Sequence, residues 1–180
     1  MFDAVVAKMI GNGILETLYM TLTSTLIAYI IGLPLGVVLV VTDKDGIRPI
    51  KWINSVLNVI VNILRSIPFL ILMMFVTPLT RAIIGTSLGP TATIVPLVIG
   101  SAPFIARLVE SSIKEIDRGV IEAAQSMGAM PMQIIWKVLL PEARPSILVG
   151  SAIAVTTILS YSAMAGIIGG RGLGDIAIRY

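Results

Sequence analysis

Side chains that could carry out covalent or acid–base chemistry are scarce in this sequence of 180 residues. It contains no cysteine and no histidine, which excludes thiol nucleophiles, Cys/His zinc sites and the commonest general base. Within or directly beside the long apolar runs the ionisable side chains are few, chiefly Arg65 and tyrosines such as Tyr161, and no two carboxylates are paired there. The sequence therefore predicts neither an enzyme nor a metal site, and its polar segments are interpreted as surfaces for recognition or passage.

The segment 119–141 is a polar, amphipathic interruption between long uncharged runs. Ala124 and Gly128 lie four residues apart, so on one helix face they would let another protein approach the backbone closely. Gly128 can also end a first helix in a left-handed cap, and Pro131 suits the first turn of a second helix. We expect Pro141 to end that second helix. The segment is predicted to be a helix, a glycine turn and a helix lying along a membrane surface.

The composition is that of a membrane protein. The chain is 56% hydrophobic and only 13% charged, with a mean hydropathy of +0.98, whereas ordinary soluble domains are about 25% charged. A spanning helix needs about 20 apolar residues, and open strands cannot cross lipid. The uncharged runs are Thr17–Thr42, Ser66–Thr80, Ala82–Ala106 and Ser146–Gly170, the second preceded by a predicted helix at Ile53–Leu64. We predict an all-α polytopic bundle with four spans, forming one domain over 1–180.

Lysine and arginine are unevenly distributed among the predicted loops. They gather in the loops 42–54 and 107–145, and the other side of the membrane holds only Lys8, Arg81 and two arginines near the C-terminus. Because basic residues are retained in the cytoplasm, both basic loops are predicted to be cytoplasmic and both ends of the chain outside. The segment 119–141 then lies on the side where ATP is available. The net charge of +3, without a basic patch interleaved with aromatics, gives no indication of nucleic-acid binding.

Polar residues recur inside the apolar part of the chain. Asn58, Asn62 and Arg65 continue a stripe at helical spacing that begins at Asn54, and such a face avoids lipid. It should face the bundle, a wet cavity or the headgroup zone; an interfacial amphipathic helix is the alternative. Gly32 and Gly36, four residues apart, suit a close helix–helix contact.

The last apolar run ends in a stretch of hydroxyl-bearing and small residues. Ser160, Tyr161 and Ser162 suit a water-lined passage, and the flexible Met164 could plug a constriction there. Ordinary packing of small residues is the alternative. The glycine-rich run 169–174 lacks the Lys-Ser/Thr of a phosphate loop and is predicted to be a flexible external turn.

The segment 119–141 resembles the coupling motif of binding-protein-dependent ABC importer permeases. The matching residues are Glu122, Ala123, Ala124, Gly128, Ile134, Leu140 and Pro141. Within that family the chain is similar to the permeases of methionine importers over nearly its whole length. The further matching segments are 65–69, 102–107, 127–129, 137–143, 161–164 and 172–174.

The resemblance implies a function and a set of partners. It implies an importer permease of the bacterial inner membrane that takes up methionine, and in which two copies form the path and ATP with magnesium binds to partner subunits. Two ATP-binding subunits would dock on the 119–141 helices, and an extracytoplasmic methionine-binding protein would deliver substrate. The residues implied in the docking are Glu122, Ala123, Ala124, Met127, Gly128, Ala129 and Pro131.

Two functional alternatives stay open from the residues themselves. The chain could be a permease for a different amino acid, or a scaffold subunit without a path. The resemblance implies a fifth span after the Gly-Leu-Gly turn at 172–174. We expect only four spans in this sequence, which has no further apolar run there.

Overall fold

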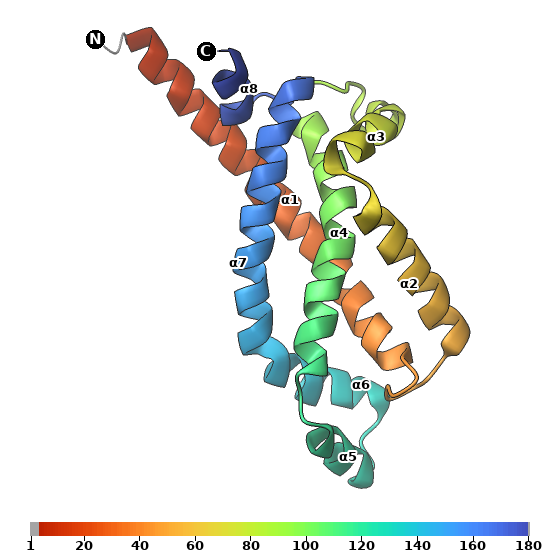
Figure 1. Ribbon diagram of the computed structural model, residues 1–180. Coiled ribbons are helices and arrows are strands. Elements are labelled where there is room, and N and C mark those ends of the chain that lie inside the picture. The colour runs from red at the N-terminus through yellow and green to blue at the C-terminus, as the bar shows by residue number, and fades with distance from the viewer. Residues whose placement is uncertain (1–3, 180) are drawn as a thin grey trace. The chain divides into compact units, whose positions relative to one another are not determined.

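The computed structural model describes residues 4–179, and these residues form helices and no strand, as predicted (Figure 1). The longer helices are α1 (Ala4–Thr42), α2 (Lys51–Ser66), α3 (Phe69–Ile84), α4 (Pro90–Lys114) and α7 (Leu140–Ala165). The shorter ones are α5 (Arg118–Ser126), α6 (Pro131–Ile134), the π-helix η1 (Ile135–Leu139), the 3₁₀-helix η2 (Gly166–Ile168) and α8 (Gly172–Arg179).

Three stretches of helix among the described residues are long and apolar enough to cross a membrane: Val6–Thr42, Pro90–Lys114 and Pro131–Ile168. The bent pair α2 and α3 provides a fourth span if the two helices are counted together. This agrees with the four predicted spans, of which the second depended on its flanking helix. The break falls at Pro68, whose ring and missing N–H oppose a continuous helix.

Some charged residues that the sequence analysis placed outside the spans lie within helices. Arg81 lies inside α3, and Arg107 and Glu110 lie inside α4, which ends at Lys114, although the sequence analysis assigned 107–145 to a loop. The assignment was wrong for 107–114 because ion pairs, described below, allow charges to remain within a helix.

Pro141 does not end the second helix of the 119–141 segment, contrary to the prediction. α6 passes through η1 directly into α7, and the Leu140 N–H donates to the carbonyl of Ile135 five residues earlier. In an α-helix a proline ring clashes with the carbonyl four residues before it. The wider π-turn directly before Pro141 relieves that crowding, so the helix continues.

The described chain falls into two compact units, and α1, α4 and α7 each contribute a segment to both. The first unit comprises Met1–Ala28, Ile67–Ser101 and Ala154–Tyr180. The second comprises Tyr29–Ser66 and Ala102–Ile153.

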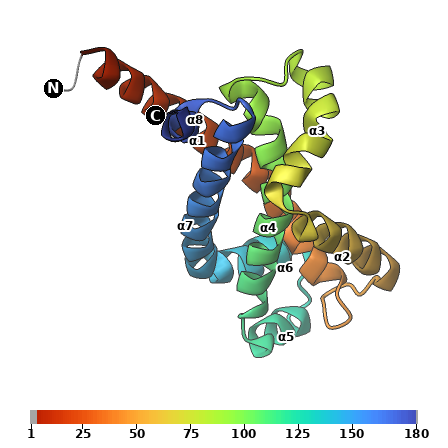
Figure 2. The same cartoon turned by 45° about the horizontal axis from the view of Figure 1, so that its top comes forward.

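In the first unit α8 lies alongside the N-terminal part of α1, as both views show (Figures 1 and 2). The Gly172 N–H donates to the carboxylate of Glu16 at 2.9 Å, and the Leu173 N–H donates to the hydroxyl of Thr17 at 2.9 Å. The run 169–174 is therefore not merely an external turn, since its last residues begin a helix that is bonded to α1.

In the second unit α1 crosses α4 at very short range. A Cβ on Gly32 would lie 2.8 Å from the Ala102 carbonyl oxygen, and one on Gly36 would lie 2.6 Å from that of Ala106. The predicted close contact of small residues is confirmed. It brings α2 into the same core, where Leu39, Val61 and Ala106 form a buried cluster.

Candidate coupling surface and its ion-pair network

α5 stands out because none of its residues is buried. Its start is fixed locally: the carboxylate of Asp117 accepts a hydrogen bond from the Gly119 N–H at 2.6 Å, as is usual for an aspartate that precedes a helix. The helix is thus capped by its own sequence and leaves its side chains available.

Gly128 ends this element in the left-handed conformation that the sequence predicts. Its φ is +78°, its N–H donates to the Gln125 carbonyl at 2.9 Å, and the Ala129 N–H donates to the Ala124 carbonyl at 3.1 Å. These are the two bonds of a Schellman motif. The same geometry corrects one expectation: Gly128 lies beyond the end of α5, so Ala124 and Gly128 do not share one helical face.

The second helix begins as predicted, with Pro131 as the first residue of α6. The Met130 N–H just before it donates to the side-chain oxygen of Gln133 at 3.0 Å. Ile134 and Leu139 are buried, so this part of the segment is anchored in the second unit while α5 is not.

The residues proposed for coupling lie mostly at the surface. Ala124 and Ala129 are partly exposed, and the other five are exposed: Glu122, Ala123, Met127, Gly128 and Pro131. Met127 is 87% exposed. Sequence reasoning missed the exposed Met130, Met132 and Trp136 beside them, although large apolar residues in a polar segment were the available signal. Flexible methionines on a surface are typical of sites that adapt to a partner.

An open cleft of about 580 Å³ lies beside α5. Its walls come from the α1–α2 loop at Asp43–Ile47, from the end of α4, and from Glu122 and Gln125 of α5. α5 is therefore held beside the α1–α2 loop without being packed into the unit.

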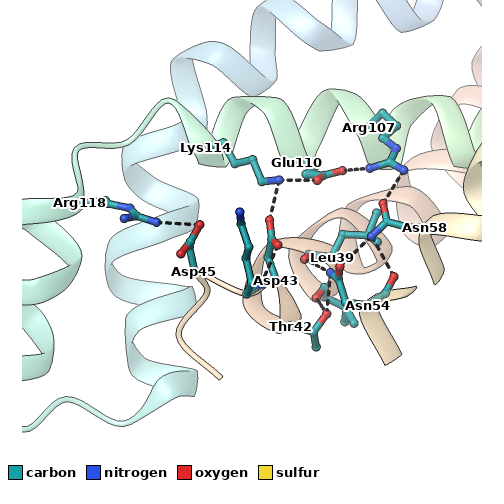
Figure 3. Close-up of polar contacts among 12 residues, drawn as sticks. Leu39, Thr42, Asp43, Asp45, Asn54, Asn58, Arg107, Glu110, Lys114 and Arg118 are labelled. Atoms are coloured by element: carbon teal, nitrogen blue, oxygen red, sulfur yellow. Dashed lines mark hydrogen bonds and ion pairs between the residues drawn. The ribbon is translucent and has the colours of Figure 1, made fainter. Parts of the chain in front are cut away.

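Ion pairs connect this region to α4 (Figure 3). Glu110 accepts from Arg107 at 2.5 Å and from Lys114 at 2.8 Å, and Lys114 also contacts the Asp43 carboxylate at 2.8 Å. The hydrogen bond from Lys114 holds the pKa of Asp43 below its usual value, against the smaller opposing effect of burial. A separate ion pair, between Asp45 of the α1–α2 loop and Arg118, joins this loop to the first residue of α5.

The polar stripe of α2 meets the same network. Arg107 donates to the side-chain oxygens of Asn58 at 2.6 Å and Asn62 at 2.9 Å. Asn54 donates to the Leu39 carbonyl of α1 at 2.7 Å. The structure thus brings two of the three predicted stripe residues to Arg107, while Arg65 is exposed. Arg107 was not anticipated as their partner, because periodicity along one helix does not identify the facing residue.

The residues proposed for a gate lie in the first unit. Tyr161 is partly buried and stacks on Phe69 with 4.5 Å between ring centroids. Ser162 is buried and donates to the Leu159 carbonyl at 2.7 Å, whereas Ser160 and Met164 are exposed. The gate stays a prediction.

Comparison with known proteins defines the class. Residues 32–179 match the model of the binding-protein-dependent transport system inner membrane component, and the chain belongs to this family. The family description confirms the predicted inner-membrane location. The family is one of transport permeases and not of enzymes.

Particular relatives are close. The chain is 54% identical over 165 residues to the probable D-methionine transport system permease protein MetI of Vibrio cholerae, covering 92% of this chain and 73% of that protein. It is 50% identical over 155 residues to D-methionine transport system permease protein MetI of Escherichia coli K12, covering 86% and 71%. Its structure is similar to the inward-facing MetNI methionine ABC transporter, with a TM-score of 0.97 at 47% identity, over 99% of this chain and 82% of that one.

Proposed function

We propose that this chain is the membrane-spanning permease subunit of an ATP-driven importer for methionine. The observation that carries the proposal is the α5–Gly128–α6 unit: a helix capped at both ends, with no buried residue, beside exposed methionines. The identity of 50–54% between this chain and D-methionine permeases, over most of its length, supports methionine as the substrate.

In this function the chain has no ATP chemistry of its own. Two ATP-binding subunits hydrolyse ATP and press on the surface formed by Glu122, Ala123, Ala124, Met127, Gly128, Ala129 and Pro131. Two copies of the permease form the path between them, which a symmetric pair achieves by repeating one surface. The ATP site and the path are distinct sites coupled through two states of the helices, as allostery requires.

The path is proposed to narrow near Tyr161 and Met164, in the hydroxyl-rich end of α7. An extracytoplasmic methionine-binding protein delivers the substrate to its outer end. Shortening Met164 to alanine is expected to leave ATP hydrolysis less dependent on substrate. A loss of stable protein with unchanged coupling would instead assign Met164 to packing, where such a truncation costs about 2–5 kcal/mol.

The decisive experiment measures uptake of labelled methionine in cells that lack their own importer, with the ATP-binding and binding-protein subunits supplied. We expect ATP-dependent uptake that excess unlabelled methionine suppresses. Uptake of a different amino acid alone would refute the substrate. A complex that assembles without any substrate-stimulated ATP hydrolysis would indicate a scaffold.

The orientation of the chain is tested by cysteine labelling, for which the cysteine-free sequence gives a clean background. A cysteine in place of the exposed Lys44 should react only with a reagent on the cytoplasmic side, and one in place of Thr86 only from outside. The reverse pattern would place α5 on the side without ATP.

A further inference from the structure

The side chain of Glu110 is the most deeply buried member of the ion-pair network, with only 10% of it exposed. A carboxylate withdrawn from water costs several kcal/mol unless charges and hydrogen bonds compensate it. Glu110 lies between two cations, with Arg107 at one oxygen and Lys114 at the other. Lys114 then shares its charge with Asp43, so the four residues form an alternating chain of two cations and two anions (Figure 3).

This chain of charges joins elements that are far apart in the sequence. Arg107 binds the α2 stripe through Asn58 and Asn62, and Lys114 binds the loop that follows α1 through Asp43. Lys114 is also the last residue of α4, and α5 begins four residues later at Arg118. The network therefore ends at the attachment point of a helix that has no buried residue of its own.

We propose that Arg107, Glu110, Lys114 and Asp43 are positioning residues that fix the base of α5 to α4, to α2 and to the α1–α2 loop. A push on α5 is then passed to the membrane helices and not absorbed by bending at 115–117. The inference rests on the proposed function and assigns the residues that transmit its motion. None of the four needs to touch substrate or ATP.

Packing alone does not provide this attachment. The buried cluster of Leu39, Val61 and Ala106 joins α1, α2 and α4 to one another but includes no residue of α5. The caps at Asp117 and Gly128 are local to α5. α5 also contacts α6 and η1, whereas the shortest ion pairs at the α4–α5 junction are those of Lys114.

The test uses Lys114→Gln and Asp43→Asn, alone and together, in the assembled complex with its ATP-binding subunits. Lys114 is half exposed, so its replacement leaves Glu110 paired with Arg107 and the fold intact, whereas Glu110→Gln would risk unfolding. Lys114→Arg keeps the charge and serves as the conservative rescue. Arg48→Gln is the control, because it removes a charge from the same loop at an exposed position outside the ion pairs described above.

The first readout is the ratio of substrate-stimulated to basal ATP hydrolysis per assembled complex. We expect Lys114→Gln and Asp43→Asn to lower this ratio at least about fivefold, the double variant to add little, and Lys114→Arg and Arg48→Gln to keep it. A ratio that stays at the parent value while the amount of complex falls would overturn the proposal, since that is what a purely structural role produces.

The second readout does not depend on transport. Spin labels on Ser111→Cys of α4 and Ser126→Cys of α5, both at exposed positions, report the distance between the two helices in the isolated permease. The distribution should be narrow in the parent and with Lys114→Arg, and broad with Lys114→Gln. A narrow distribution in every variant would refute the positioning role. If the distribution broadens with Lys114→Gln but the parent chain itself does not import methionine, the proposed function is refuted and the positioning role stands.

Discussion

Two short helices of nearly equal length, α5 in the second unit and α8 in the first, are held in opposite ways. The backbone of α8 lies against η2 and the end of α7, so that a Cβ on Gly166 would lie 2.4 Å from the Asp175 nitrogen and a Cβ on Gly174 would lie 2.2 Å from the Ala163 carbonyl oxygen. α5 has no buried residue, and nothing lies within 4 Å of where a Cβ on Gly128 would be.

The difference separates a helix that is part of the packing from one that is available for binding. The backbone of α8 is in close contact with its neighbours at Gly174 and its first N–H groups are bonded to α1, although the side chains of Leu173 and Ile178 are exposed. The caps of α5 and an ion pair at its base hold it in place while its side chains face outward. Elements that move or bind are usually drawn from such weakly packed regions.

The largest effect is expected where the packing is closest, at Gly174. Gly174→Ala would place a methyl group within 3 Å of backbone atoms that cannot move aside, and we expect a loss of about 3 kcal/mol, the upper end of what overpacking normally costs. Gly11→Ala, in α1 with open space around it, is the matched control and should be neutral or slightly stabilising. Thermal unfolding in detergent measures both. Equal unfolding midpoints would show that α8 is not packed as described.

Gly128 should respond less in stability and more in partner binding. A non-glycine residue at its positive φ costs about 1–2 kcal/mol, and valine adds bulk to an open surface. We expect Gly128→Val to insert into the membrane but lose the ATP-binding subunits on co-purification. Gly128→Asn tolerates the conformation and Gly128→Ala adds little bulk, so together they separate strain from bulk. A valine variant that retains its full complement of subunits and transports normally would rule out this surface for coupling.

The contrast also shows what the sequence could predict. The left-handed turn at Gly128, the helix start at Pro131 and the close contact at Gly32 follow from local residue properties, and the structure has all three. The continuation through Pro141 was missed because a proline predicts a helix end unless a π-turn precedes it, and that turn has no local signature.

Contacts between residues far apart in the chain could not be predicted from the sequence either. Spacing identified the stripe at Asn58 and Asn62 but could not show that Arg107 faces it from another helix. The contact of Glu16 with the start of α8 spans most of the chain, so no window of sequence contains both partners. Roles in transport depend on partner proteins and on motion, which neither periodicity nor helix caps encode.

A smaller effect is expected at Glu16, which caps α8 from α1. Glu16→Ala removes the acceptor of the Gly172 N–H at the helix start, and such a loss costs about 1 kcal/mol. Glu16→Gln keeps an acceptor and loses only the charge, so its effect should be smaller still. Hydrogen exchange of the peptide covering 172–179 measures the change. Unaltered protection in the alanine variant would mean that packing alone holds α8.

The smallest effects are expected at the exposed ion pairs, of which each short helix has one. Arg118 at the start of α5 lies 3.4 Å from Asp45, and Arg179 at the end of α8 lies 2.7 Å from Asp175. Exposed pairs typically contribute about 0.2–1 kcal/mol and are screened by salt. Asp45→Asn and Asp175→Asn should each shift the unfolding midpoint only slightly at low salt, and not at all in about 1 M salt, where the Debye length falls to about 3 Å. Asp175→Asn should have the larger effect of the two, because its carboxylate is only 19% exposed against 55% for Asp45. A salt-independent loss at Asp45 as large as that at Gly174 would mean that α5 is fixed as firmly as α8, and the contrast between the two helices would fail.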